Sequence, residues 1–169
     1  MSETLIGIII GGGIGIIGSL ITILVQYLTS TFIVKYENLH NERAQIIKNL
    51  YQRVVKTYRS FYSYMNPLQL AGEPNQESKG KETAKLANEF TDYYEENRIF
   101  IDKKLTKEVD KLSKVFREAW AEFETHRMLQ GKKEFDFKNW QKAWNIISKE
   151  TPLIKEKIED EFRGIIGIK

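Results

Sequence analysis

Thr4–Val34 reads TLIGIIIGGGIGIIGSLITILVQYLTSTFIV and carries neither a charged residue nor a proline over 31 positions. About 20 apolar residues are enough for a helix to cross the ~30 Å hydrocarbon layer of a membrane. One alternative is a cleaved signal peptide, but Met1–Thr4 has no basic residue and no small-residue cleavage site follows the long apolar run. The other alternative, a buried core helix, would be unusually long and uniformly apolar. The stretch therefore predicts a single transmembrane helix within residues 1–34.

Small residues repeat along one face of this predicted helix. Six glycines fall within twelve positions, several of them four residues apart. Residues three and four apart share a helix face, and such small ridges let helix backbones approach closely in lipid. Because glycine costs about 1 kcal/mol of helix propensity, the cluster indicates a packing role, although membrane helices also tolerate glycine generally. We expect an oligomerisation stripe that joins several copies and consists of Gly7, Gly11, Gly15, Gly18 and Ser19.

Polar side chains continue this face toward the end of the span. Gln26 is the one strongly polar residue there, and Thr22 and Thr29 lie about one turn away on either side. An amide that faces lipid would leave hydrogen-bonding groups unpaired. In an assembly of several copies, these three residues would form polar rings that line an ion pathway. Two alternatives remain open, namely hydrogen bonding between helices without conduction, and hydration of Gln26 near the cytoplasmic boundary.

The charges around the span predict its orientation. No basic residue precedes it, whereas six lie between Lys35 and Arg59. The positive-inside rule places the N-terminus outside and the C-terminal part in the cytoplasm, so that the chain is a single-pass protein of the inner (plasma) membrane. The absence of cysteine is compatible with a reducing compartment. The net charge of +3 fits an anionic inner leaflet and does not require a nucleic-acid partner.

Residues 35–169 form a predicted cytoplasmic helical domain. Apolar residues recur at steps of three and four over 36–65, 82–97, 102–123 and 136–163, and the polar segment 66–81, with two prolines, is expected to be a mobile loop. Asp102 is a predicted N-cap, Phe116 and Trp120 are predicted to be buried, and residues 99–101 are expected to plug the core. The predicted fold class is all-α, with a four- or five-helix bundle after the transmembrane helix.

Two local features of the bundle have defined expectations. Gly131 is expected to end the third helix. Thr151-Pro152 lies inside the last helical pattern, so either the proline kinks one helix or Thr151 caps a new helix with Pro152 in its first turn. The apolar tail 164–169 is expected to dock on the bundle or on a neighbouring subunit.

Catalytic and metal-binding motifs are missing from the sequence. The two histidines have no metal-ligand spacing around them, and there is no cysteine, no H-E-x-x-H and no nucleophile elbow. The glycine cluster lies in an apolar run without a following lysine, which excludes a phosphate-binding loop. We therefore expect no catalytic residue, no cofactor and no metal, and a protein that is not an enzyme.

Two groups of basic residues are candidate contacts for the phosphates of a nucleotide or oligonucleotide ligand. Trp140 and Trp144, with lysines nearby, could stack on its bases. The alternative is that the tryptophans belong to the core and the basic residues are solvated helix surface, since acidic residues are interleaved with them. The candidate ligand contacts are Lys48, Lys56, Arg59, Lys103, Lys107 and Lys111.

The segments FTDYYEENRIFI (Phe90–Ile101) and WQKAW to TPLIKEKIEDEFRGIIG (Trp140–Gly167) resemble those of small bacterial membrane proteins with one N-terminal span and a helical cytoplasmic domain. The layout is similar to that of the channel-forming effectors of anti-phage defence, such as the effector of the Hailong system. This resemblance implies a homo-oligomeric channel that a nucleotide-type ligand controls through the cytoplasmic domain. It assigns no ligand-binding residue.

Two functions from different classes follow. The first is an oligomeric membrane channel, with the span as conduit and the helical domain as gate. The second is a membrane-anchored adaptor whose helical domain recruits a cytoplasmic protein partner, with the glycine face serving only for self-association. Gln26 and its polar neighbours favour the channel.

Overall fold

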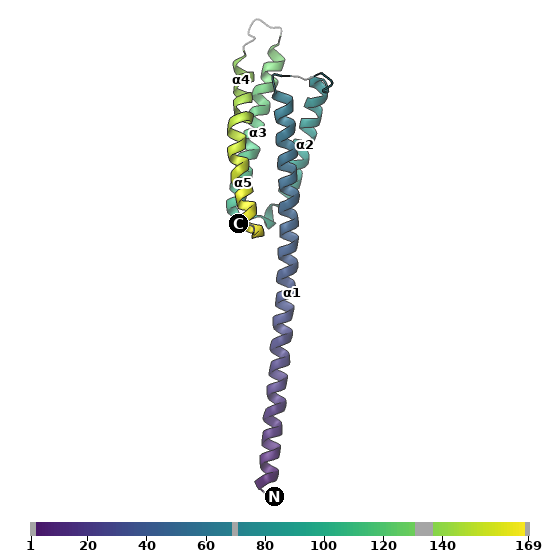
Figure 1. Ribbon diagram of the computed structural model, residues 1–169, viewed down its shortest axis with the longest axis vertical. Helices are drawn as coiled ribbons and strands as arrows, with labels where there is room; N and C mark the ends of the chain where they lie inside the picture. Colours follow the sequence, from purple (N-terminus) through teal and green to yellow (C-terminus); the bar gives the residue numbers. More distant parts are fainter. Residues whose placement is uncertain (1–2, 69–70, 131–136, 168–169) are drawn as a thin grey trace. The chain divides into compact units, whose positions relative to one another are not determined.

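The computed structural model describes residues 3–68, 71–130 and 137–167, except for the side chains of residues 3–18, 20 and 166 (Figure 1). Over these ranges all regular structure is helical, which confirms the predicted all-α class. The chain divides into two compact units, Met1–Glu42 (unit 1) and Arg43–Lys169 (unit 2), and the boundary falls inside the first helix. The elements are α1 Glu3–Met65, α2 Gln76–Asn97, η1 Arg98–Phe100, α3 Lys103–Leu129, α4 Lys138–Asn145, η2 Ile146–Glu150 and α5 Thr151–Ile166.

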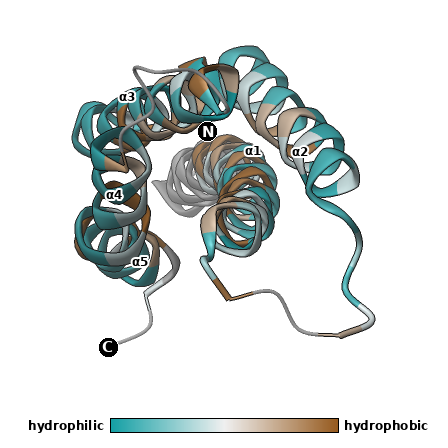
Figure 2. Cartoon of the chain, turned by 90° about the horizontal axis from the view of Figure 1, so that it is seen from above, coloured by the Kyte–Doolittle hydropathy of each residue, from teal (hydrophilic) through white to brown (hydrophobic). Residues whose placement is uncertain are grey.

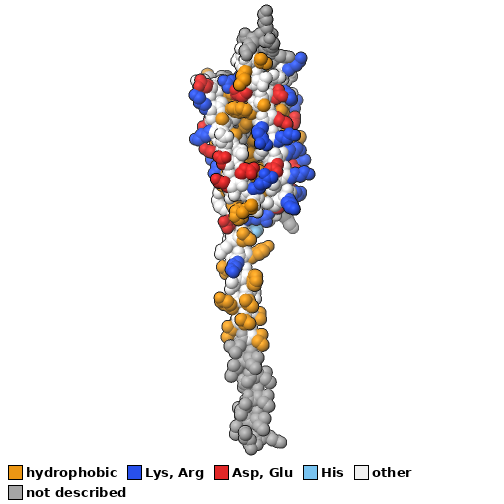
Figure 3. Space-filling view, turned by 180° about the vertical axis from the view of Figure 1, so that it is seen from behind, with side chains coloured by type: hydrophobic (Ala, Val, Ile, Leu, Met, Phe, Trp, Pro, Cys, Tyr) orange, Lys and Arg blue, Asp and Glu red, His pale blue; other side chains and the backbone are white. Residues whose placement is uncertain are grey.

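Unit 1 consists of the N-terminal part of α1. Its large apolar side chains from Ile21 to Leu39 are between 48 and 75% exposed (Figure 3). A search of the described residues finds no helix that is long and apolar enough to cross a membrane. The side chains of residues 4–18 and 20, which belong to the predicted transmembrane stretch, lie outside the described residues.

Unit 2 is an antiparallel helical bundle, as the sequence predicts. The C-terminal part of α1 lies among α2, α3 and the run formed by α4, η2 and α5 (Figure 2). Each helix turns an apolar stripe inward, because its apolar residues recur at steps of three and four. Fully buried side chains of α1, α2, α3, η2 and α5 meet in one core that includes Leu50, Tyr64, Phe90, Leu112, Phe116, Ile147 and Ile158.

The start of α2 corrects the expected loop over 66–81. The helix begins at Gln76, so that residues 76–81 of that segment are helical. Asn75 caps it, and its Oδ1 accepts a hydrogen bond from Ser78 N at 2.8 Å. Lys79 is buried and its Nζ donates to Glu73 Oε2 at 2.5 Å. Gly80 is also buried, because α2 passes closely over Tyr64 there. The polar composition of this segment and its glycine predicted a loop. In the structure, Gly80 instead belongs to the part of α2 that packs closely on Tyr64 of α1.

The link between α2 and α3 only partly agrees with the expected core plug. Ile101 is buried, but Ile99 is 86% exposed, so the expectation was wrong for Ile99. Residues 98–100 form a single 3₁₀ turn, η1, that directs neighbouring side chains to different sides. The predicted N-cap is confirmed, since Asp102 Oδ1 accepts hydrogen bonds from Lys104 N at 3.0 Å and Leu105 N at 2.9 Å. The predicted break at Gly131 lies outside the described residues.

A new helix, α5, begins at Thr151 with Pro152 in its first turn, as one of the two alternatives predicted, but Thr151 is not its cap. The π-helical segment η2, Ile146–Glu150, precedes it directly and connects α4 to α5. Proline lacks an N–H and its ring crowds the carbonyl four residues earlier, and a wider π turn relieves this crowding. The Thr151 hydroxyl donates backward to Ile146 O at 3.0 Å, so it does not act as an N-cap. Helix α5 ends at Gly167, whose φ of 73° suits glycine. Of the tail that was expected to dock, Ile165 packs against the core, and residues 168 and 169 lie outside the described residues.

Gly80→Ala should lower the free energy of unfolding of the full chain by about 1–3 kcal/mol. A Cβ at this position would lie 2.9 Å from Tyr64 Oη. Tyr64 cannot move freely because its hydroxyl is hydrogen-bonded to Glu124 and Arg127. Urea unfolding followed by near-ultraviolet circular dichroism measures the change.

Gly164→Ala is the matched control, because nothing lies within 4 Å of the Cβ that it adds to α5. Its higher helix propensity should raise the stability by about 0.5–1 kcal/mol. Equal effects of the two substitutions would contradict the close contact between Gly80 and Tyr64.

Candidate functional site

The main candidate site is a groove between α2 and α3 in unit 2, with a volume of about 700 Å³. Helix α1 contributes Phe61 to its floor. Ligand sites in proteins commonly have volumes of about 300–1,000 Å³ and apolar walls with a few polar groups. The other lining residues come from α2, η1 and α3, namely Ala84, Ala87, Asn88, Phe90, Thr91, Tyr94, Glu95, Arg98, Asp110, Ser113, Phe116, Arg117 and Trp120.

Aromatic rings form the floor of this groove. Phe61 and Phe116 stack with ring centroids 4.7 Å apart and an interplanar angle of 7°. Trp120 lies edge-on to Phe61, with centroids 6.1 Å apart, and Phe90 lies edge-on to Phe116 at 6.2 Å. The rings hold one another in place, so the floor is preformed.

Phe116 is buried as predicted, whereas Trp120, also predicted to be buried, packs against the core but is only partly buried. The groove explains the difference. On the opposite wall α2 presents Ala84 and Ala87. Their methyl groups are too small to cover the indole ring. One side of Trp120 therefore stays open to a ligand.

A network of charged groups occupies one end of the groove. The Tyr94 hydroxyl donates to Asp110 Oδ1 at 2.7 Å, and Arg98 Nη2 donates to Asp110 Oδ2 at 2.8 Å. Arg98 also lies 3.5 Å from Glu95 and over the ring of Tyr94. Burial of Tyr94, together with its hydrogen bond to Asp110, raises the pKa of its hydroxyl above the ordinary 10.0. These groups satisfy one another and hold α2, η1 and α3 together.

Two polar side chains of the groove are not engaged in this way. Arg117 on α3 is exposed, and in the described part of the chain it has no ion pair or hydrogen bond. The same holds for the Asn88 amide on α2. Both side chains can donate hydrogen bonds, and the Arg117 guanidinium is a cation. The groove thus combines an aromatic floor with an unused cation at its edge.

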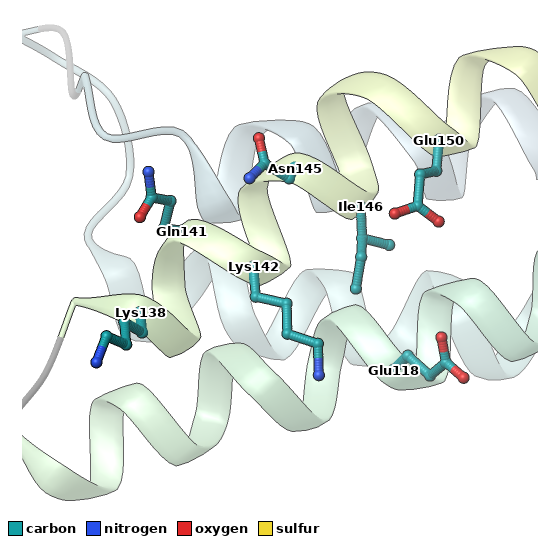
Figure 4. A pocket seen from close by; sticks show the side chains of 7 residues that line it. All are labelled: Glu118, Lys138, Gln141, Lys142, Asn145, Ile146 and Glu150. Carbon is teal, nitrogen blue, oxygen red and sulfur yellow. The ribbon is translucent and has the colours of Figure 1, made fainter.

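A second, more polar hollow of about 430 Å³ lies between α3 and the run of α4 and η2 (Figure 4). Its charges are mixed, since Lys138 and Lys142 lie near Glu118 and Glu150. Lys142 extends toward α3 and pairs there with Glu122. The described residues contain no cluster of three or more histidine, cysteine, aspartate or glutamate side chains that could hold a metal ion. The hollow thus has neither a free charge of one sign nor a metal-binding set.

The tryptophans considered for base stacking do not line this hollow. Trp140 Nε1 donates to Met65 O at 3.1 Å, and the Trp144 ring lies 4.9 Å from that of Tyr62. Both pack against the core. The structure therefore places them on the side of α4 that faces α1, away from Lys138 and Lys142.

The six candidate ligand contacts are all exposed and belong to two different helices, α1 and α3. Arg59 lines a shallow hollow with Tyr58, Tyr62 and Glu73, and the three lysines of α3 do not take part in it. None of the six lines the groove between α2 and α3, where Arg117 and Asn88 lie instead. The sequence signal for the groove would have been two alanines on α2 opposite a row of aromatic residues on α3.

The candidate pore-lining residues Thr22, Gln26 and Thr29 are exposed, as is Ser19 of the predicted stripe. Thr29 Oγ1 donates to Val25 O of its own helix at 2.8 Å. The Gln26 amide has no hydrogen bond to the described residues. The surroundings of the other stripe residues lie outside the described part of the structure. These residues are Gly7, Gly11, Gly15 and Gly18.

Comparison with protein-family models, with curated proteins and with solved structures finds no match to this chain.

The raised pKa of Tyr94 predicts a loss of stability in alkali. The unfolded chain releases this proton near pH 10, whereas the folded chain holds it to a higher pH. The stabilisation is therefore complete below pH 10 and is lost as the pH rises above 10. Tyr94→Phe should unfold at a lower urea concentration than the wild type at pH 8, but lose less stability between pH 8 and pH 11.

Tyr36→Phe is the control for this pH experiment, because Tyr36 is 75% exposed. It should behave as the wild type at both pH values. An equal loss between pH 8 and pH 11 in the wild type and in Tyr94→Phe would contradict the assignment.

Proposed function

We propose that the chain is a homo-oligomeric membrane channel, in which the N-terminal part of α1 spans the inner membrane and unit 2 controls opening from the cytoplasm. The observation that carries this proposal is the run of exposed large apolar side chains from Ile21 to Val34, with Gln26 in its middle. Contiguous exposed apolar surface of this kind is typical of contacts with a membrane or with partner helices. The uncharged sequence from Thr4 onward extends that surface.

Gln26 distinguishes a conducting assembly from a simple anchor. Its amide needs hydrogen-bond partners in an apolar environment, and no described residue supplies one. In a parallel assembly joined through the glycine stripe, the amides of several copies would surround the axis with Thr22 next to them. Such a ring can hold water or a partly dehydrated ion.

Unit 2 supplies the sensing part of the proposed channel. The basic residues after the span support a cytoplasmic position for it. The groove between α2 and α3 offers a ligand-sized site within it. The layout resembles that of channel-forming effectors of anti-phage defence, which supports a nucleotide-type ligand as the trigger and an antiviral role.

The second candidate is a membrane-anchored adaptor whose helical domain recruits a cytoplasmic protein. One observation favours it. The hydroxyls of Thr29, Ser30 and Thr31 donate to carbonyl groups of their own helix at 2.8–3.0 Å. Because they are satisfied within the helix, they can face lipid and do not require a water-filled axis. In this case Gln26 would bond to the neighbouring helices without conduction.

Replacement of both Gly11 and Gly15 by leucine should separate the subunits in detergent, because the larger side chains prevent close approach of the helices. Cross-linking and light scattering measure the assembly, and circular dichroism checks that unit 2 stays folded. Ile9→Leu and Ile16→Leu together make the control, since they change no small residue. Unchanged cross-linking of the glycine variant would show that the stripe is not the interface.

Gln26→Leu should abolish ion currents without preventing assembly, because an apolar axis loses its water. Gln26→Glu should shift selectivity toward cations, since a ring of carboxylates concentrates them. Planar-bilayer recording of the purified chain, with and without nucleotides, measures both effects. Thr31→Val is the control, because the Thr31 hydroxyl bonds to its own helix. If no condition yields currents that depend on position 26, the adaptor function replaces the channel.

A further inference from the structure

We infer that the groove between α2 and α3 is a binding site for a small ligand with a planar aromatic body and one anionic group, a carboxylate or a phosphate. The inference concerns binding by unit 2 alone and does not require that the N-terminal helix conducts ions. If conduction fails and binding persists, only the channel proposal falls.

The aromatic floor of the groove favours a ligand with a planar aromatic body. Trp120 is the partly exposed ring of the hollow, and it rests on the buried rings of Phe61 and Phe116. Neighbouring centroids in this floor lie 4.7–6.2 Å apart. These are the spacings at which aromatic rings attract one another, so a further flat ring can pack on the exposed part of Trp120. Ala84 and Ala87 line the same hollow and present only methyl groups to it. The volume of about 700 Å³ is in the range for small molecules.

The charged side chains of the groove favour a ligand with an anionic group and determine where that group lies. The guanidinium of Arg98 is already bound to Asp110 and Glu95, so it does not attract a further anion strongly. Arg117 is the groove's other cation, and neither it nor Asn88 has a partner in the described part of the chain. A carboxylate or phosphate can accept charge-assisted hydrogen bonds from Arg117 in a bidentate manner. The carboxylates of Glu95 and Asp110 disfavour a second anionic group near them.

The experiment uses the full chain in nanodiscs of zwitterionic lipid and isothermal titration calorimetry. Three probes share one ring system, namely 1-naphthyl phosphate, 1-naphthoate and the neutral 1-naphthol. Both anions should bind about tenfold or more tightly than naphthol, because hydrogen bonds to charged groups contribute more than neutral ones. The ratio of the two anions distinguishes a phosphate site from a carboxylate site. Nanodiscs without protein give the heat of partition into lipid.

Two variants and a control place the binding in the groove. Arg117→Gln should weaken the better anion about tenfold and remove its advantage over naphthol. Ala87→Leu should weaken all three probes, since the added side chain fills the space above the rings. Lys111→Gln is the control, because Lys111 is an exposed cation of the same helix that does not line the groove. Circular dichroism verifies that each variant is folded.

Three results would overturn the inference. The first is that no naphthyl compound binds to the wild type. The second is that naphthol binds as tightly as the anions and Arg117→Gln changes nothing. The third is that Lys111→Gln, and not Arg117→Gln, weakens binding, which would assign the anion to the outer lysine face of α3.

Discussion

Packing against one face of α1 is the interaction on which the rest of unit 2 depends. The other helices each meet this face through a specific contact. On α2 the carbonyl of Leu86 accepts a hydrogen bond from Thr57, and on α3 the ring of Phe116 stacks on Phe61. On α4 Trp140 donates to the Met65 carbonyl, and on α5 Phe162 lies edge-on to Tyr51. Helices α2 to α5 thus share α1 as a packing partner, and the groove between α2 and α3 has Phe61 of α1 in its floor.

A partly buried polar network around Tyr64 orients the helices within this packing. Tyr64 of α1 donates to Glu124 Oε1 at 2.5 Å and accepts from Arg127 Nη1 at 2.6 Å, both on α3, while Gly80 lets α2 pass over its ring. Burial raises the pKa of the Tyr64 hydroxyl, which keeps it protonated and able to donate. Buried polar groups stabilise a fold only when they are satisfied, so this network specifies how three helices meet.

The two units differ in what they leave exposed. Unit 1 exposes large apolar side chains from Ile21 to Val34, and in the proposed function this surface contacts lipid or other helices. Unit 2 packs most of its described apolar residues into one core and has an aromatic groove with Arg117 at its edge. This difference supports a division between membrane assembly and ligand recognition within one chain.

The sequence by itself determined the helical class, the periodic core faces and the N-cap at Asp102, because these depend on the spacing of apolar residues and on local backbone chemistry. It also identified the uncharged stretch Thr4–Val34 and its polar row, whose role in a membrane stays a prediction. Only the tertiary structure decided that Gly80 belongs to a helix contact, that a π-helical segment accommodates Pro152, and that Trp120 borders a groove. It also decided that Arg117, and none of the six basic residues expected from the sequence, lies beside that groove. The physical reason is that periodicity tells which side of a helix is apolar, whereas the size of the residues on the neighbouring helix, here two alanines, decides whether that side is covered.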